Sequence, residues 1–143
     1  FEAGRAITLR GAALRPLVDD LASALASEDR LKTQAAAQQL LSGLVFYLDA
    51  PAVRVEVLAA RPARRWGELH GLYTEAERGR PAHITLWMRT ARQKRVVAFR
   101  TFLRTLLHEL GHHLDYTLIK LADSFHTEGF YKRESSLYHQ LTG

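Results

Sequence analysis

Two histidines stand four residues apart at His108 and His112, and Glu109 directly follows the first of them. On an α-helix this spacing places both imidazoles on one face, where they can reach a single zinc ion at about 2.0–2.1 Å. A glutamate beside the first ligand reaches a metal-bound water rather than the ion, which is the position of a general base. The segment therefore predicts a hydrolytic metal site. The alternative is a helix whose polar residues face solvent without any metal.

A catalytic zinc site needs three protein ligands and one open position for water. The first choice for the third ligand is His126, which follows a predicted helix break and opens the next helix. The alternative is Glu134, further along the same predicted helix. Asp115, one turn after His112, is better placed to accept a hydrogen bond from a ligand imidazole than to bind metal. The remaining histidines are not expected to share the metal, because His113 points about 100° away from His112 and the others lack ligand spacing: His113, His70, His83 and His139.

The run from His108 to Phe130 resembles the SprT-like (Spartan-like) zinc metallopeptidases. That family carries HExxH on one helix, then a short connection, then a histidine that opens another helix with a phenylalanine four residues later. His108–His112 match the first part, and His126 with Phe130 match the second. The chain departs from the family at Thr127, where Gly or Ser is usual, and in the extra His113. The resemblance implies a zincin-like domain with His108, His112 and His126 as zinc ligands, and it suggests DNA-bound proteins as substrates.

Such a site predicts hydrolysis of peptide bonds by a zinc-activated water, with Glu109 as the general base that passes the proton to the leaving amine. The attacked carbonyl develops negative charge, which needs a further donor or cation. The candidates for that role are equally well explained by packing or ion pairing: Tyr131, Arg133 and Tyr138. The substrate backbone is expected to pair with an exposed edge strand near the zinc helix, and residues 83–88 are the strand predicted to do so.

Two other functions remain open at this point. The first is a non-catalytic binding module stabilised by zinc, with both His126 and Glu134 on the metal and no room for water. The second is a nucleic-acid-binding protein in which the HExxH segment is incidental. The net charge of +5 is compatible with DNA or another acidic partner, and equally with a solvated basic surface. The basic residues cluster along the chain: Arg61, Arg64, Arg65, Arg89, Arg92, Lys94, Arg95, Arg100 and Arg104.

Composition sets the remaining limits. A chain of 143 residues suits one core, so a single domain spanning residues 1–143 is expected. Cysteine is absent, so any metal must be held by nitrogen and oxygen ligands, and imidazoles favour zinc. The lack of cysteine also favours a cytoplasmic, intracellular protein, while a chain that starts at Phe1 leaves secretion open. No membrane segment is expected, because no apolar run in the sequence is long enough to cross a bilayer.

Hydrophobic periodicity predicts an α+β fold with two N-terminal helices, a small, mainly antiparallel three-stranded sheet, the HExxH helix and a C-terminal helix. Apolar residues at intervals of three and four mark the first helix over residues 14–25 and the second over 31–48, which Pro51 ends. Alternation marks strands at 53–58 and 67–76, and a more continuously apolar segment marks a third strand at 83–88, with the last two forming a hairpin. The zinc helix is predicted over about 94–121 and the last helix over about 127–141.

Overall fold

The computed structural model describes residue 9 and residues 11–61, 71–121 and 123–143. It has an α+β fold, as predicted, with four helices and three strands in the described ranges. In chain order these are α1 (Gly11–Ala26), α2 (Arg30–Leu48), β1 (Val53–Leu58), β2 (Gly71–Thr74), β3 (Ala82–Trp87), α3 (Phe99–Thr117) and α4 (Glu128–Thr142).

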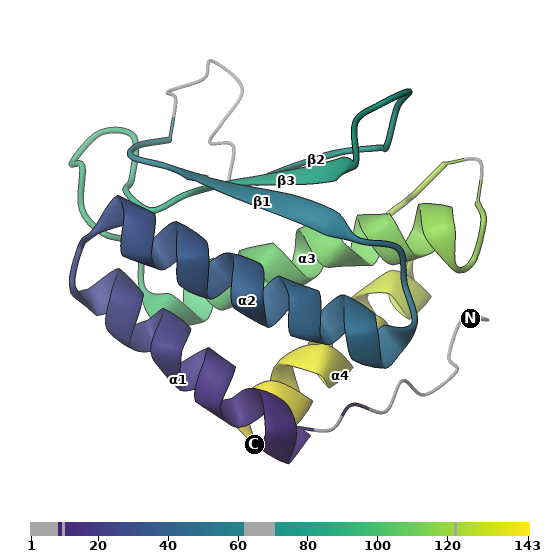
Figure 1. The fold of residues 1–143 in the computed structure, drawn as a ribbon, viewed down its shortest axis with the longest axis horizontal. Coiled ribbons are helices and arrows are strands. Elements are labelled where there is room, and N and C mark those ends of the chain that lie inside the picture. The colour runs from purple at the N-terminus through teal and green to yellow at the C-terminus, as the bar shows by residue number, and fades with distance from the viewer. Residues whose placement is uncertain (1–8, 10, 62–70, 122) are drawn as a thin grey trace.

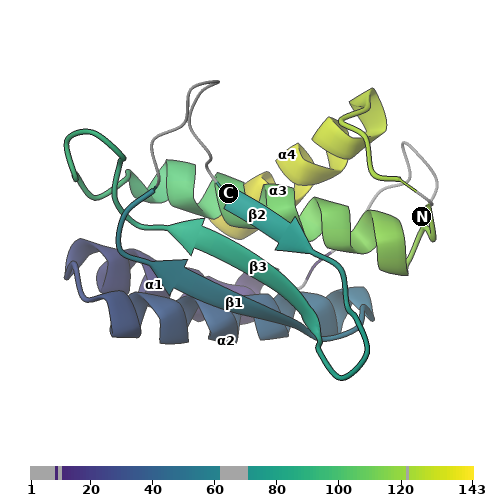
Figure 2. The ribbon, with the colours of Figure 1, turned by 90° about the horizontal axis from the view of Figure 1, so that it is seen from above.

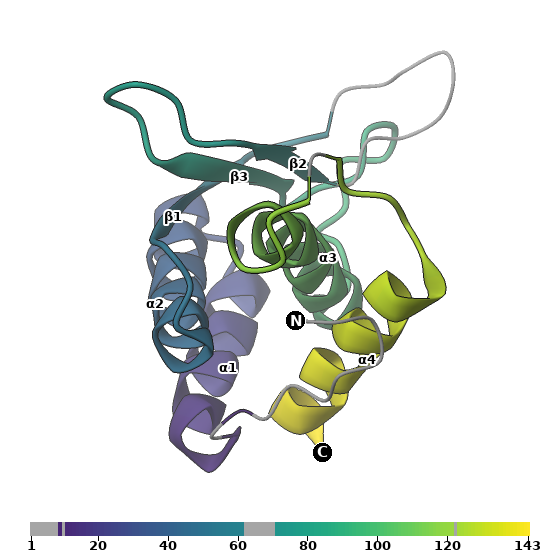
Figure 3. The same ribbon diagram turned by 90° about the vertical axis from the view of Figure 1, so that its right-hand side faces the viewer.

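The helices pack on one side of the sheet (Figure 1), which leaves the other side visible from above in Figure 2. Helix α2 packs on β1 and on α1, whereas α3 packs on β2 and β3. Helix α4 packs on α3 and α1, away from the sheet, as the end view in Figure 3 shows. This arrangement puts the HExxH helix, α3, between the sheet and α4. Residues of the sheet and residues of α4 can therefore both reach the polar side of α3.

Two predictions about the sheet are wrong. The strand order is β1-β3-β2, so β3 lies in the centre rather than at an edge. The sheet is also mixed rather than mainly antiparallel, because β1 runs parallel to β3 while β2 forms the predicted antiparallel hairpin with it. All of β3 except His83 is buried. A continuously apolar strand is typical of one that has neighbours on both sides, which is the physical reason for its central place.

Side chains from α2 cover the outer edge of β1. The Val55 N–H donates to Gln38 Oε1 at 2.8 Å, and the Val57 N–H donates to Gln34 Oε1 at 3.0 Å. Gln38 also donates to the Val53 carbonyl at 3.1 Å. An uncovered edge strand presents unpaired backbone groups that can bind another chain. Among the described residues no strand or side chain pairs with the outer edge of β2, so within these ranges β2 is the strand with an uncovered edge.

Capping residues fix where the helices begin. Asp29 caps α2 by accepting a hydrogen bond from the Lys32 N–H, and Thr127 caps α4 by accepting one from the Phe130 N–H. Helix α3 begins at Phe99, later than predicted, because the preceding segment returns to the end of β3. There the Val97 N–H donates to the Met88 carbonyl, so this backbone extends the strand pairing instead of the helix.

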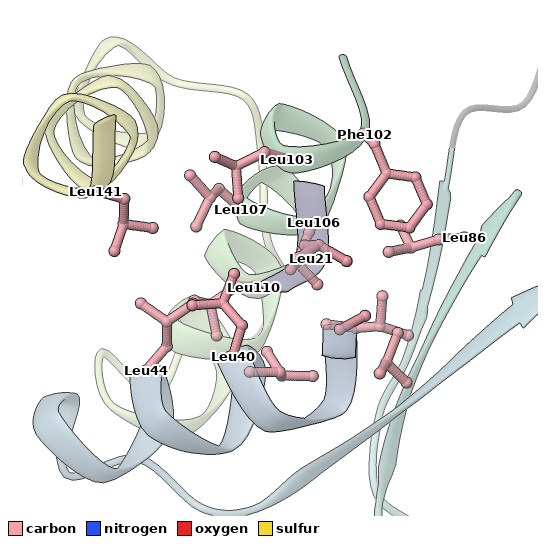
Figure 4. Packing of buried hydrophobic residues seen from close by; sticks show 14 of the residues in the cluster. Leu21, Leu40, Leu44, Leu86, Phe102, Leu103, Leu106, Leu107, Leu110 and Leu141 are labelled. Carbon is pink, nitrogen blue, oxygen red and sulfur yellow. The ribbon is translucent and has the colours of Figure 1, made fainter. Parts of the chain in front are cut away.

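The leucines of α3 fill the centre of the core. Leu103, Leu106, Leu107 and Leu110 are completely buried, and they meet leucines of α1, α2 and α4 and the inner face of β3 (Figure 4). Burying one such side chain stabilises the fold by about 1.5–3 kcal/mol. This buried apolar face fixes the direction in which His108 and His112, on another side of α3, point. None of the described helices combines the length and apolar character needed to span a bilayer.

Candidate metal centre

Three histidines converge between α3 and the start of α4. One ring nitrogen from each of His108, His112 and His126 lies within 4.8 Å of the others, close enough for one metal ion. The Nε2 atoms of His112 and His126 are 3.2 Å apart. Two nitrogens at about 2.05 Å from a tetrahedral zinc would be separated by about 3.3 Å. The pair already has the separation that a shared ion requires.

The opposite ring nitrogens of two of these histidines are held by acceptors. His108 Nδ1 lies 2.7 Å from Glu134 Oε1, and His112 Nδ1 lies 2.7 Å from Ser124 Oγ. A proton on each Nδ1 satisfies these contacts and leaves the Nε2 lone pairs for a metal, as outer partners of ligating imidazoles do. The donor set therefore fits a divalent ion that accepts imidazoles. In this arrangement Glu134, the alternative ligand, orients His108 instead.

Asp115 is connected to His112 through Ser124, a residue that the sequence analysis does not identify. Ser124 accepts from His112 and donates to Asp115 Oδ2 at 2.5 Å. The other carboxylate oxygen of Asp115 accepts from Arg133 at 2.9 Å, and both side chains are buried. The predicted acceptor role of Asp115 is thus exercised through Ser124. Because Arg133 is committed to this buried pair, it is not free to stabilise charge on a substrate.

His113 lies on a different side of α3, as predicted. Its Nε2 donates to the Pro51 carbonyl at 2.7 Å, and the Tyr73 hydroxyl donates to its Nδ1 at 2.8 Å. Burial lowers the pKa of His113 and raises that of Tyr73, so both groups are held neutral. The neutral imidazole joins β2 to the start of β1 and takes no part in the metal cluster.

Phe130 forms the floor under the three imidazoles. Its ring centroid lies 5.1 Å from that of His108, 4.9 Å from that of His112 and 5.2 Å from that of His126. The approach is possible because Gly111 has no side chain, since a Cβ at that position would lie 2.8 Å from two ring carbons of Phe130. The glycine inside the motif thus lets α4 pack closely enough to hold His126 at the site.

Glu109 lies on the opposite side of the cluster, beneath the first residue of β2. A Cβ on Gly71 would come within 3.1 Å of the Glu109 Cγ and Oε2 atoms, so the strand passes directly over the carboxylate. Burial raises the Glu109 pKa to about 7 in the metal-free protein, although the positive charge of His108 acts against this. A carboxyl group with a pKa near neutrality is suited to accept and release a proton.

The two α3 histidines differ in proton affinity in the metal-free protein. The hydrogen bond to Glu134 raises the pKa of His108, whereas burial and the charges of His108 and His126 lower that of His112 to about 4. An imidazole must be neutral to bind a metal. His112 is therefore ready to bind across the whole physiological pH range.

We expect Glu109→Gln to stabilise the metal-free protein at alkaline pH. Between pH 4.5 and about 7 the folded protein retains a proton on Glu109 that the unfolded chain has released, so stability falls as pH rises through this range. The glutamine variant does not lose this stability, and the difference amounts to at most about 3 kcal/mol. Thermal unfolding of both metal-free proteins should show a small difference at pH 5 and a larger one, in favour of the variant, at pH 8. A difference independent of pH would contradict the raised pKa.

A cleft runs along β2 on both sides of the histidines. One half, of about 410 Å³, extends along α3 past Thr105 and Arg104. The other half, of about 600 Å³, extends past His126 and along β2 to Glu75. Both halves are lined by Gly71, His108 and Glu109. The three histidines and the carboxylate therefore face a groove that continues in both directions, as an extended ligand requires.

The other residues singled out in the sequence lie outside the cluster. Tyr131 is half exposed beside His126, and Tyr138 lies under the Arg104 guanidinium. His83 lies on β3, 3.9 Å from Glu56, and His139 is exposed on α4. His70, Arg64 and Arg65 fall outside the described residues. Among the basic residues assigned to a surface, Arg61 is buried and Arg89 is paired with Glu28.

No protein-family model, curated protein or solved structure matches this chain. What the site can do must therefore be inferred from its own residues: three imidazoles able to hold a metal ion, a buried carboxylate beside them and an open groove through both.

Proposed function

We propose that the protein is a zinc-dependent metallopeptidase of the HExxH class with a zincin-like fold. The observation that carries the proposal is the convergence of His108, His112 and His126 in a cleft that Glu109 also lines. Three imidazoles with an open fourth position are typical of catalytic rather than structural zinc. The resemblance to SprT-like peptidases, which rests on the same residues, supports the same assignment.

Each residue of the site has a separate role in the proposed reaction. Zinc bound at the three histidines would supply the polarisation of a water molecule and of the substrate carbonyl. Glu109 takes a proton from the water at one carboxylate oxygen and delivers it to the nitrogen of the departing amine. Glu134 and Ser124 hold the Nδ1 protons of His108 and His112, which keeps the Nε2 atoms directed at the ion.

The substrate backbone would pair with the outer edge of β2. This replaces the predicted pairing with β3, whose two edges are already occupied by β1 and β2. Gly71 brings the β2 backbone over Glu109, and the groove follows β2 from there. A peptide added as a fourth strand gains main-chain hydrogen bonds and crosses the metal position.

A closed, purely structural zinc site is less well supported. It needs a fourth protein ligand, and the alternative for that place, Glu134, instead accepts a hydrogen bond from the outer nitrogen of His108. The experiment that separates the two functions is hydrolysis of an unfolded polypeptide by the zinc-loaded protein. Cleavage that stops when a chelator removes zinc, and returns when zinc is restored, supports the peptidase. A folded, zinc-loaded protein that cleaves no polypeptide supports the binding module.

A further inference from the structure

We propose that Arg104 forms a subsite for a substrate carboxylate, so that the enzyme prefers Asp or Glu immediately after the scissile bond. This inference rests on the proposed peptidase function and adds the chemical class of its substrate. It starts from the half of the cleft that lies along α3, where Arg104 stands one turn before His108 and lines the same wall.

The Arg104 guanidinium is held in place without being enclosed. Its central carbon lies 4.1 Å from the centre of the Tyr138 ring, a cation–π contact that fixes the plane of the group. The side chain keeps about a third of its surface exposed. Two threonines line the same part of the cleft, Thr101 and Thr105, and none of the described lining residues there has an apolar side chain. A planar cation fixed at the wall of a cleft is suited to bind a carboxylate with two hydrogen bonds.

The acidic groups near Arg104 do not neutralise its guanidinium, which can therefore attract a negatively charged ligand. The only carboxylate paired with it among the described residues is Glu134, and that contact is long, at 3.9 Å to Oε2. The other oxygen of Glu134 serves His108 at 2.7 Å. A divalent ion at the histidines would offset the two carboxylates in this half of the cleft, Glu109 and Glu134. Within the described ranges, the positive charge of Arg104 then has no carboxylate partner of equal strength.

The direction of the peptide follows from β2. Of the β2 residues only Gly71, at the start of the strand, lines the half of the cleft that contains Arg104. The other half follows the whole of β2 and continues past Thr74 to Glu75 and Glu77. Antiparallel pairing is slightly more stable per residue than parallel pairing. An antiparallel peptide would place the residues after the scissile bond beside Arg104 and those before it beside the two glutamates. Asp or Glu is then favoured after the cleaved bond.

The test uses three peptides that differ only in the residue after the scissile bond, which is Glu, Gln or Lys. A charge-assisted hydrogen-bonded pair contributes about 1.5–3 kcal/mol, so the zinc-loaded wild-type protein should show kcat/KM about tenfold or more higher for Glu than for Gln. Arg104→Gln should bring that ratio close to one. Arg104→Glu should reverse the preference in favour of the Lys peptide, which a merely structural disturbance would not do.

Controls separate this inference from the proposed function. Arg15→Gln removes an equal charge from an exposed position on α1 and should leave the Glu-to-Gln ratio unchanged. Zinc content measured on each variant shows whether the metal site has survived.

A zinc-loaded wild-type protein that cleaves none of the peptides contradicts the peptidase itself. Cleavage with equal rates for Glu and Gln overturns the subsite even if the Arg104 variants do not fold. An acidic preference confined to the residue before the bond overturns the antiparallel direction.

Discussion

Replacing Glu109 by glutamine is expected to lower kcat/KM for peptide cleavage by about a thousandfold while zinc stays bound. The glutamine side chain has nearly the same size and fits the same space beneath Gly71. It cannot accept the proton of the attacking water, and general acid–base catalysis contributes about 10²–10⁴-fold. Because Glu109 is absent from the nitrogen cluster that can hold the ion, zinc affinity should not fall with activity. Initial rates on a quenched fluorescent peptide, together with zinc content, measure both properties.

A matched control is Glu56→Gln, which makes the same chemical change on the exposed side of β1. It should retain the activity of the wild-type protein. Full activity in Glu109→Gln would show that the proton is taken by another group. Loss of zinc together with activity would place the carboxylate on the metal and would remove the assignment of a general base.

The second large effect is expected from His126→Ala, which should weaken zinc binding by at least about a hundredfold. Apparent zinc-binding energies of small sites are about 10–16 kcal/mol, so the loss of one of three protein ligands removes several kcal/mol. The Nε2 of His126 lies 3.2 Å from that of His112, so the two nitrogens are placed to share one ion. Competition with a chromogenic chelator reports the dissociation constant of each variant.

His139→Ala provides the comparison, since this histidine is exposed on α4 and lies outside the metal cluster. Its zinc affinity should match that of the wild-type protein. If His126→Ala binds zinc as tightly as the wild type and Glu134→Ala does not, the third ligand is the glutamate and the hydrogen bond to His108 must break on metal binding.

The part of the site that lies on α3 could be predicted from local spacing. His108, Glu109 and His112 share one helical turn, so their relative positions follow from helix geometry alone. His126 could also be predicted, because the helix break before it and the cap at Thr127 bring the chain back toward α3. The same reasoning correctly separated His113 from the cluster.

The groups that support the ligands could not be predicted in the same way. Ser124 has no periodic pattern and lies in a connection whose path is set by tertiary packing. The sequence predicts Glu134 as the alternative third ligand. Only the docking of α4 decides whether its carboxylate lies at the metal position or beside the Nδ1 atom of His108. That docking depends on the contact between Gly111 and Phe130, which is possible because glycine has no side chain. The glycine inside the HExxH segment is therefore the sequence feature that could have indicated this close packing.

The sheet illustrates the limit of local patterns most clearly. Residue alternation located β1, and the short turn identified the β2–β3 hairpin, since both are local features. The parallel pairing of β1 with β3 joins segments separated by β2. No local sequence feature of either strand indicates which strand it pairs with. The prediction that β3 forms an edge strand is wrong. Its mostly apolar sequence is the feature that is typical of a strand with two neighbours.

The most direct measurement is a titration of the metal-free protein with zinc in which bound metal and peptide cleavage are followed in the same samples. The three-histidine site predicts that cleavage is absent at the start, rises in proportion to bound zinc and levels off at one ion per chain. Zinc that binds at one equivalent without producing cleavage, or cleavage that is already complete before zinc is added, would contradict the proposal.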